Sequence, residues 1–380
     1  MKRLALLILL CVMCAACAPV SAEGGTTLLA INVGKADCLL LQSGGTIYMI
    51  DTGLEESWGA VSAVLKLHGV TRLDGVILTH TDKDHAGGAW ALASSSIEVG
   101  GWYAPAYFTG VKEAKHPLVK AAALRGEAVT WLHAGDTLPL GEGVLTVLGP
   151  VVHDTNKENN NSLVLRVETP DGTMLLAGDM EFPEENSLMT QGLITPAHVL
   201  KVGNHGEADA TGDAFARLVN PRVAVISTNT QDEPDTPAPR VLRALAGAQI
   251  VQTQQAQAGV LVTLRSGEAQ ANELSYPALP ERPQGVTISD RSVAQDVICL
   301  RNDGRAAVDI SAWFIYSDKG GQTFVFPAGT VLQPGQEISV SALDSPDAGD
   351  FVWQDTEVWH PEKPDTALLY DVYGRLADEY

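Results

Sequence analysis

Four side chains that can bind a metal ion lie within six residues of one another near position 80. They are His80, Asp82, Asp84 and His85. The segment that carries them, residues 79–88, follows the apolar run 75–78 and ends in two glycines, which permit a tight backbone turn. Imidazole and carboxylate groups are ligands of catalytic divalent metal ions. The segment therefore predicts a metal site in a loop at the end of a strand.

The elements that must position this loop alternate between strand-like and helical patterns from residue 26 to residue 266. Short apolar runs occur at 28–33, 38–41, 47–50, 76–78, 163–167, 174–177, 199–202, 223–226 and 260–264. Helical spacing of apolar residues is found at 58–67, 214–219 and 241–246. Strands interleaved with helices predict an α/β fold layered around sheet. Tight glycine turns such as Ser43–Gly45 favour antiparallel hairpins, so we expect mixed sheets.

The last hundred residues follow a different pattern. Three prolines, Pro277, Pro280 and Pro283, predict a linker over residues 276–285. Residues 286–380 hold short apolar runs separated by turn residues at about the 8–12-residue spacing of a β-sandwich. We therefore expect a separate all-β domain after the linker.

The first 22 residues are typical of an export signal. Lys2 and Arg3 precede the apolar run 4–12, which is short for a transmembrane helix. Two endings are open: the small residues 20–22 suit cleavage before residue 23, and the segment ending at Cys17 is similar to a bacterial lipobox. Both predict an extracellular or cell-surface protein, and the second adds a lipid anchor to the outer face of the membrane. Only Cys38 and Cys299 remain after this leader, and we expect no disulfide between them.

Composition restricts the class of protein. The chain of 380 residues is 45% hydrophobic and carries 25 Lys+Arg against 46 Asp+Glu, a net charge of −21. These values exclude a disordered chain and a collagen, and the length predicts about two domains. The acidic balance also opposes a general polyanion binder. Nucleic acid would need a local basic path, for which the candidates are Lys201, Arg217, Arg222, Arg240 and Arg243.

The metal-binding segment resembles the His-x-His-x-Asp-His motif of the metallo-β-lactamase superfamily, in the form with aspartate at the second histidine found in the ComEC-type competence-protein branch. Further segments resemble that branch in the same order: 32–38, 50–53, 159–165, 176–179 and 200–206. The resemblance implies an αββα sandwich over residues 23–275. Residues 286–380 resemble a lamin-tail domain, an immunoglobulin-like sandwich in which Trp313 and Trp359 would be core residues.

This resemblance implies a metal-dependent hydrolase with one or two divalent ions, Mn²⁺, Zn²⁺ or Mg²⁺. His80 and Asp82 would hold one ion, and Asp84 and His85 the second, with His205 nearby. Asp179 would bridge the two ions, and Asn159 or Asn160 would hydrogen-bond the site or the substrate. The expected catalytic residues are Asp84, Asp179, Asn159 and Asn160. The branch implies a nucleic acid or nucleotide phosphodiester as substrate, and it identifies no ligand for the lamin-tail domain.

Three positions depart from the motifs of the superfamily or the branch. Asp82 makes the site richer in oxygen, which favours Mn²⁺ or Mg²⁺ relative to Zn²⁺. Asn204 and Thr236 stand where histidines are expected, although Asp232 or Asp235 could replace the second of these. The alternative hypothesis is therefore a catalytically degenerate surface protein that acts as a binding module.

Overall fold

The computed structural model describes residues 25–356 and 358–380. The expected signal peptide, with Cys17, lies outside the described residues. Within them, no helix combines the length and the apolar character that a membrane span requires. Cys38 is buried and Cys299 is half-buried, and both thiols are free, as the sequence predicts.

The first sheet has the strand order β17-β16-β1-β2-β3-β5-β7-β8. Its strands are β1 (Thr26–Ile31), β2 (Leu39–Ser43), β3 (Thr46–Ile50), β5 (Gly75–Ile77), β7 (Trp102–Pro105), β8 (Val129–Leu132), β16 (Gly259–Arg265) and β17 (Glu268–Leu274). The pairs from β17 to β3 are antiparallel, and those from β3 to β8 are parallel. The prediction of mixed sheets is confirmed. A short parallel pair, β4 (Arg72–Leu73) and β6 (Glu98–Val99), lies apart from it.

The second sheet has the strand order β15-β14-β13-β12-β11-β10-β9. Its strands are β9 (Thr137–Leu140), β10 (Gly143–Gly149), β11 (Val164–Thr169), β12 (Gly172–Leu176), β13 (Val199–Lys201), β14 (Val223–Ile226) and β15 (Gln249–Gln252). One buried cluster joins the facing sides of the two sheets and includes Leu28 and Leu41 from the first and Leu165 and Val225 from the second. The site lies at an edge of this sandwich, where strands of both sheets end.

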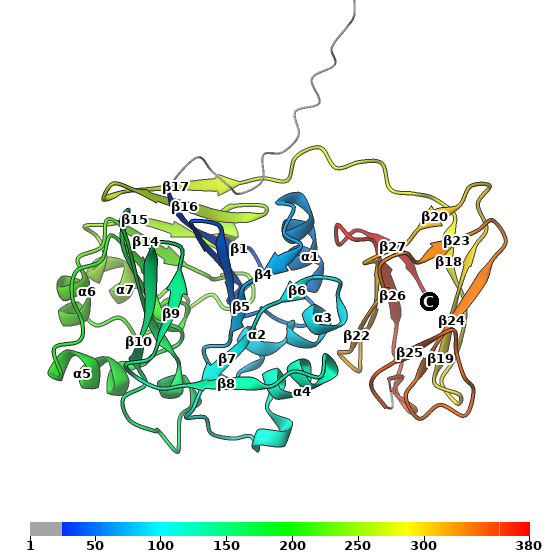
Figure 1. The fold of residues 1–380 in the computed structure, drawn as a ribbon, viewed down its shortest axis with the longest axis horizontal. Coiled ribbons are helices and arrows are strands. Elements are labelled where there is room, and N and C mark those ends of the chain that lie inside the picture. Colours follow the sequence, from blue (N-terminus) through cyan, green and yellow to red (C-terminus); the bar gives the residue numbers. More distant parts are fainter. Residues whose placement is uncertain (1–24, 357) are drawn as a thin grey trace, which may run out of the picture.

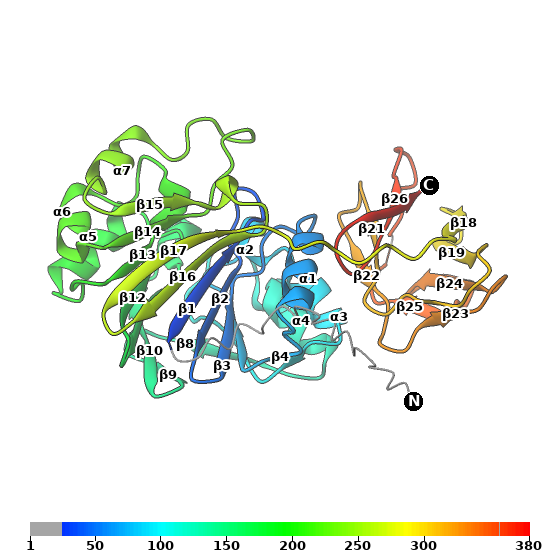
Figure 2. The ribbon, with the colours of Figure 1, turned by 90° about the horizontal axis from the view of Figure 1, so that it is seen from above.

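Helices cover the outer face of each sheet and complete the αββα layering (Figure 2). The first sheet carries α1 (Trp58–Leu67), α3 (Ala89–Ser94) and α4 (Pro117–Leu124), and the second carries α5 (Phe182–Thr190), α6 (Asp213–Val219) and α7 (Pro239–Ala244). Between β5 and α3 lies α2 (Lys83–Ala86), and the 3-10 turns are η1 (Glu113–Lys115), η2 (Glu158–Asn161), η3 (Gly203–Gly206) and η4 (Thr253–Gln255). In α1 the helical spacing buries Val61, Val64 and Leu65 against the sheet, so this predicted helix is confirmed.

The C-terminal part is built from β-strands alone, in two four-stranded sheets and a two-stranded pair. The strands are β18 (Val286–Ser292), β19 (Val297–Asn302), β20 (Val308–Asp309), β21 (Phe314–Ser317), β22 (Thr323–Val325), β23 (Val331–Leu332), β24 (Glu337–Ala342), β25 (Phe351–Trp353), β26 (Ala367–Tyr370) and β27 (Leu376–Glu379). Trp313 and Trp359 lie in its core, each 3% exposed, as the sequence predicts.

The two parts of the chain pack against each other (Figure 1). Phe314 and Val325 of the C-terminal part belong to the buried cluster that also holds Val61 of α1. The Ser62 hydroxyl donates a hydrogen bond to the carbonyl oxygen of Val372, at 3.0 Å. The C-terminal sandwich therefore shares buried apolar surface with the helical layer beside the metal-binding loop.

Candidate metal centre

The candidate ligands lie on three loops that follow the strands β5, β12 and β13. The β5 loop leads into α2, which carries Asp84 and His85. After β12, Gly178 adopts a φ of 51°, and a Cβ there would lie 2.9 Å from the Cβ of Ser162. The Asp179 amide donates to the Ser162 hydroxyl at 3.1 Å. Strand ends from both sheets thus bring residues that are far apart in the sequence to one edge of the sandwich.

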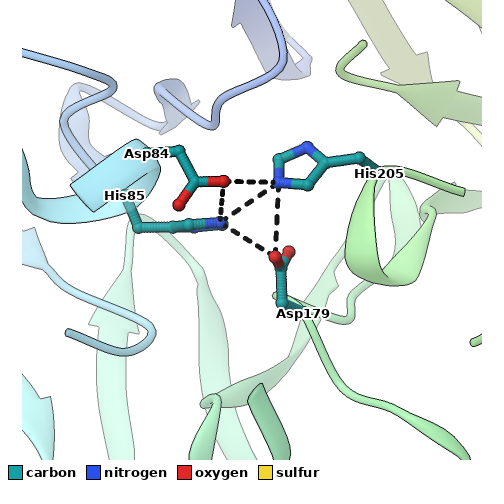
Figure 3. A group of neighbouring side chains, drawn as sticks. All are labelled: Asp84, His85, Asp179 and His205. Carbon is teal, nitrogen blue, oxygen red and sulfur yellow. Dashed lines mark hydrogen bonds and ion pairs between the residues drawn. The ribbon is translucent and has the colours of Figure 1, made fainter. Parts of the chain in front are cut away.

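One group of four residues has the geometry of a cation site (Figure 3). Asp84, His85, Asp179 and His205 each offer a ligand atom, and these atoms all lie within 4.8 Å of one another. Asp179 Oδ2 is 3.2 Å from His85 Nε2 and 3.3 Å from His205 Nε2. His205 Nε2 is 3.2 Å from Asp84 Oδ2 and 3.3 Å from His85 Nε2. Four of the six predicted metal ligands therefore converge.

Hydrogen bonds behind the two imidazoles fix which nitrogen faces the group. His85 Nδ1 lies 2.8 Å from Asp51 Oδ2, and His205 Nδ1 lies 2.9 Å from the carbonyl oxygen of Ser227. Carboxylate and carbonyl oxygens accept, so we assign the proton of each neutral ring to Nδ1. Each Nε2 then presents a lone pair to the group. This carboxylate–histidine arrangement is the usual support behind a metal-binding histidine.

The two remaining predicted ligands, His80 and Asp82, lie beside this group. The His80 ring centroid is 4.1 Å from that of His85, and His80 Nε2 is 3.6 Å from Asp82 Oδ2. His80 Nε2 and Asp179 Oδ1 are both buried without a hydrogen-bond partner. Buried polar atoms normally have partners, and a cation held by the four-residue group would supply one for the Asp179 oxygen. The residues present therefore fit the divalent ion that the sequence implies.

The carboxylates set the protonation of the histidines. Burial lowers the pKa of His205, but Asp179 and Asp84 outweigh it and raise that pKa to about 9. Burial raises the pKa of Asp84, and the hydrogen bond and charge of His205 and the charge of His85 reverse this and lower it to about 2. The pKa of His85 is raised well above its ordinary value despite burial, by Asp179 and Asp51. The group thus holds excess negative charge that protons or a cation must balance.

Buried residues behind the ligands hold the loop in place. Asp51 accepts hydrogen bonds from the amide and hydroxyl of Thr79, at 2.7 and 2.8 Å. Asp37 also approaches His85, but its carboxylate forms a 2.7 Å ion pair with Lys201. Lys201 is 0% exposed, so its expected place in a basic path for nucleic acid is wrong.

Sequence reasoning assigned no part to Asp37 or Asp51, although both lie in the segments that resemble the ComEC-type branch. It also missed Glu158, whose carboxylate accepts from the amide and hydroxyl of Thr81, at 3.0 and 2.7 Å. The sequence signal that could have identified Asp51 is its position directly after the apolar run 47–50, where a carboxylate lies at a strand end. Asp37, Asp51 and Glu158 all lie far in sequence from the metal-binding loop, so their contacts with Thr79, Thr81 and His85 could not be predicted from local pattern.

The other predicted residues point elsewhere. Asn159 Nδ2 donates to Glu181 and Asn160 Nδ2 to Asp154, so both amide groups have partners outside the four-residue group, and their catalytic part stays a prediction. The two departures from the branch motif are satisfied by their own partners. Asn204 Nδ2 donates to Asp209 at 3.1 Å, and Thr236 lies 3.1 Å from the Thr228 hydroxyl. Asp232 and Asp235 are exposed and lie outside the group.

Comparison with known proteins identifies the two families that the chain matches. The profile of the Metallo-beta-lactamase superfamily matches residues 31–230, and that of the Lamin Tail Domain matches residues 280–380. The chain is similar to ComE operon protein 3 of Bacillus subtilis (strain 168), with 31% identity over 245 residues, covering 60% of this chain and 31% of the relative.

Two further similarities are found, one to a curated protein and one to a solved structure. Competence protein ComA of Neisseria gonorrhoeae is 29% identical over 204 residues, which cover 53% of this chain and 25% of the relative. The structure of the metallo-beta-lactamase fold protein YhfI from Bacillus subtilis aligns with a TM-score of 0.42 and 14% identity, over 63% of this chain and 99% of that one. The chain thus spans a third or less of the length of the curated relatives it matches.

The predicted αββα sandwich and all-β C-terminal domain are therefore confirmed. The site carries the Asp and His cluster typical of metal-binding members of this hydrolase fold. The chain belongs to the metallo-β-lactamase superfamily, in a domain related to ComE operon protein 3 and ComA, and a lamin tail domain follows.

Proposed function

We propose that the chain is a metal-dependent hydrolase that cleaves phosphodiester bonds at the Asp84–His85–Asp179–His205 group. The observation that carries the proposal is the pair of Nε2 atoms held toward two carboxylates by partners behind each ring. The four residues would hold one divalent ion, and His80 and Asp82 with Asp179 would hold a second. A bound divalent ion supplies a water molecule of lowered pKa and screens the charge that develops on a phosphoryl oxygen.

The chain's own residues orient this site and limit its access. Asp51 holds the His85 ring, and the Asp37–Lys201 ion pair balances charge directly behind it. The side chain of Asp84 is 28% exposed, whereas those of His85 and His205 are buried, so a substrate would approach on the Asp84 side. The oxygen-rich donor set supports Mn²⁺ or Mg²⁺ as the ion.

A non-catalytic binding module is the second candidate. It is favoured by Asn204 and Thr236, because each is engaged with its own partner and offers no imidazole to the site. For both candidate functions, we propose that the protein is exported and works at the cell surface or outside the cell. The leader pattern of residues 1–22, with Cys17 as a candidate lipid attachment point, supports this location.

One comparison separates the two functions. The purified chain is loaded with Mn²⁺, its metal content is measured, and hydrolysis of bis(p-nitrophenyl) phosphate is followed in the parent and in Asp84→Ala. The matched control is Asp235→Ala, an exposed aspartate outside the group. We expect Asp84→Ala to lose metal and more than about a hundredfold in rate, since loss of a supporting partner alone costs about 10–100-fold. Equal hydrolysis rates in all three proteins would reject the proposed hydrolase and leave the binding module as the function.

A further inference from the structure

A cavity of about 400 Å³ lies between the metallo-β-lactamase domain and the lamin tail domain. On one side it is lined by Thr81 and Lys83, which belong to the loop that carries the metal ligands. On the other side it is lined by residues 320–322 and Asp355 of the lamin tail domain. Its volume falls within the range of about 300–1,000 Å³ of small-molecule sites. The cavity therefore adjoins the candidate metal centre and needs both domains to form.

The cavity concentrates positive charge in an acidic protein. Lys83, Lys115 and Lys120 all line it, although the net charge of the chain is −21. In the described part of the chain, none of these three ammonium groups forms an ion pair within 4.0 Å. Unpaired lysines grouped in one cavity attract an anion, and phosphate is an anion that lysine binds well as a point charge.

The opposite wall offers hydrogen-bond acceptors. Asp355 lines this wall, and Glu55 of the metallo-β-lactamase domain also lines the cavity, where its carboxyl group accepts a hydrogen bond from the backbone of Thr323 and ties the two domains together. Residues 320–322 line the same wall as Asp355. A carboxylate at a cavity wall, such as that of Asp355, accepts hydrogen bonds from a ligand that donates. A ligand for this cavity should therefore combine an anionic group with hydrogen-bond donors.

An aromatic ring completes the lining. Trp90 is half-buried and lines both this cavity and a second one of about 250 Å³, which continues between the domains past Phe324 and Trp353. Nucleobases stack on such rings with little dependence on sequence. Phosphate, base face and base amino groups thus each find a counterpart in the lining: the lysines, Trp90 and the carboxyl groups of Asp355 and Glu55.

We propose that this interdomain cavity is a subsite for a nucleotide unit next to the scissile bond, so that the lamin tail domain forms one wall of the substrate site. The inference takes its substrate class from the proposed function. It gives the lamin tail domain a part in substrate recognition in addition to its packing against α1 and α3.

The test compares two double variants with the same change in charge. Lys115→Glu with Lys120→Glu alters the cavity, and Lys112→Glu with Arg305→Glu alters exposed residues outside its lining. Binding of a fluorescein-labelled single-stranded phosphorothioate DNA, which resists cleavage, is followed by fluorescence anisotropy as salt rises from about 50 to 200 mM. Circular dichroism checks that each variant is folded.

We expect the cavity variant to lose more than about tenfold in affinity, with a salt slope smaller by about 1.4 for two lost phosphate contacts on a single strand. The control variant should stay within about twofold of the parent. A second variant, Gln322→Trp, fills the cavity from the lamin tail side without changing charge and should weaken binding by a similar factor.

The outcomes separate this inference from the proposed function. Equal affinities of the two double variants, or no binding of the probe by the parent, would overturn the subsite even if the small chromogenic ester is hydrolysed. Lysine-dependent binding without hydrolysis of that ester would keep the subsite and reject the proposed hydrolysis.

Discussion

Asp51→Asn is the sharpest test of how the metal centre is built. One Asp51 oxygen accepts from the Thr79 amide at 2.7 Å, and the other accepts from the Thr79 hydroxyl and His85 Nδ1, both at 2.8 Å. The backbone amide can only donate, so asparagine must turn its oxygen toward it. The new NH₂ group then faces His85 Nδ1. The ring avoids this clash of donors by moving its proton to Nε2, which removes a metal ligand.

The size of the effect follows from the part Asp51 plays. Loss of a partner behind a metal-binding histidine costs about 10–100-fold in metal affinity, or about 1.4–2.8 kcal/mol. The backbone should tolerate the change, because Asp51 has a φ of 59° and asparagine adopts that region readily. We therefore expect a folded protein with weakened metal binding.

The assay is isothermal titration of the metal-free protein with Mn²⁺, with urea unfolding as a check on stability. Asp74→Asn is the matched control, since Asp74 accepts from the Ile47 amide of β3 at 2.9 Å, in the same sheet, and lies outside the site. It should bind Mn²⁺ within about twofold of the parent. Parental affinity in Asp51→Asn would refute the assignment of His85 Nε2 as a ligand.

Two further predictions concern stability. Lys201→Met removes the ion-pair partner of the buried Asp37 carboxylate and should lower the free energy of unfolding, measured in urea, by about 3–5 kcal/mol. The double variant Lys201→Met/Asp37→Asn should recover part of this loss. No recovery would show that the ion pair is not the cause. His116 is buried, and burial lowers its pKa to about 4 from an ordinary value of 6.5. The unfolded chain therefore takes up this proton first, so stability is full above about pH 6.5 and falls by about 2 kcal/mol by pH 5. His116→Asn keeps a hydrogen-bond acceptor at the start of α4, and its free energy of unfolding in urea should not show this loss of about 2 kcal/mol between about pH 6.5 and pH 5. An unchanged loss in the variant would contradict the assignment of this pH dependence to His116.

Much of the fold could be predicted from local pattern. The helix Trp58–Leu67 and the apolar runs of the central strands follow from periodicity alone, because each element buries one face or both. The metal-binding segment was recognisable because its four donors resemble a family motif and further segments of that family follow in the same order along the chain. Trp313 and Trp359 were expected core residues because a sandwich interior needs large apolar side chains.

What could not be predicted depends on contacts across the sandwich. Lys201 was expected at a surface but is buried, because its strand ends opposite Asp37, which lies more than 160 residues earlier. Asn204 occupies a position expected to hold a ligand, and its amide instead donates to Asp209. Such pairings are set by how the two sheets meet, and no local pattern records them.

The sequence by itself determined the donor types, their order along the chain and the strand ends that carry them, because these depend on local periodicity and on the chemistry of single side chains. Only the tertiary structure decided which atoms meet. His85 and His205 are 120 residues apart, and their Nε2 atoms face each other at 3.3 Å because Asp51 and Ser227 hold the opposite side of each ring. The interdomain cavity exists only because the lamin tail domain packs beside the metal-binding loop.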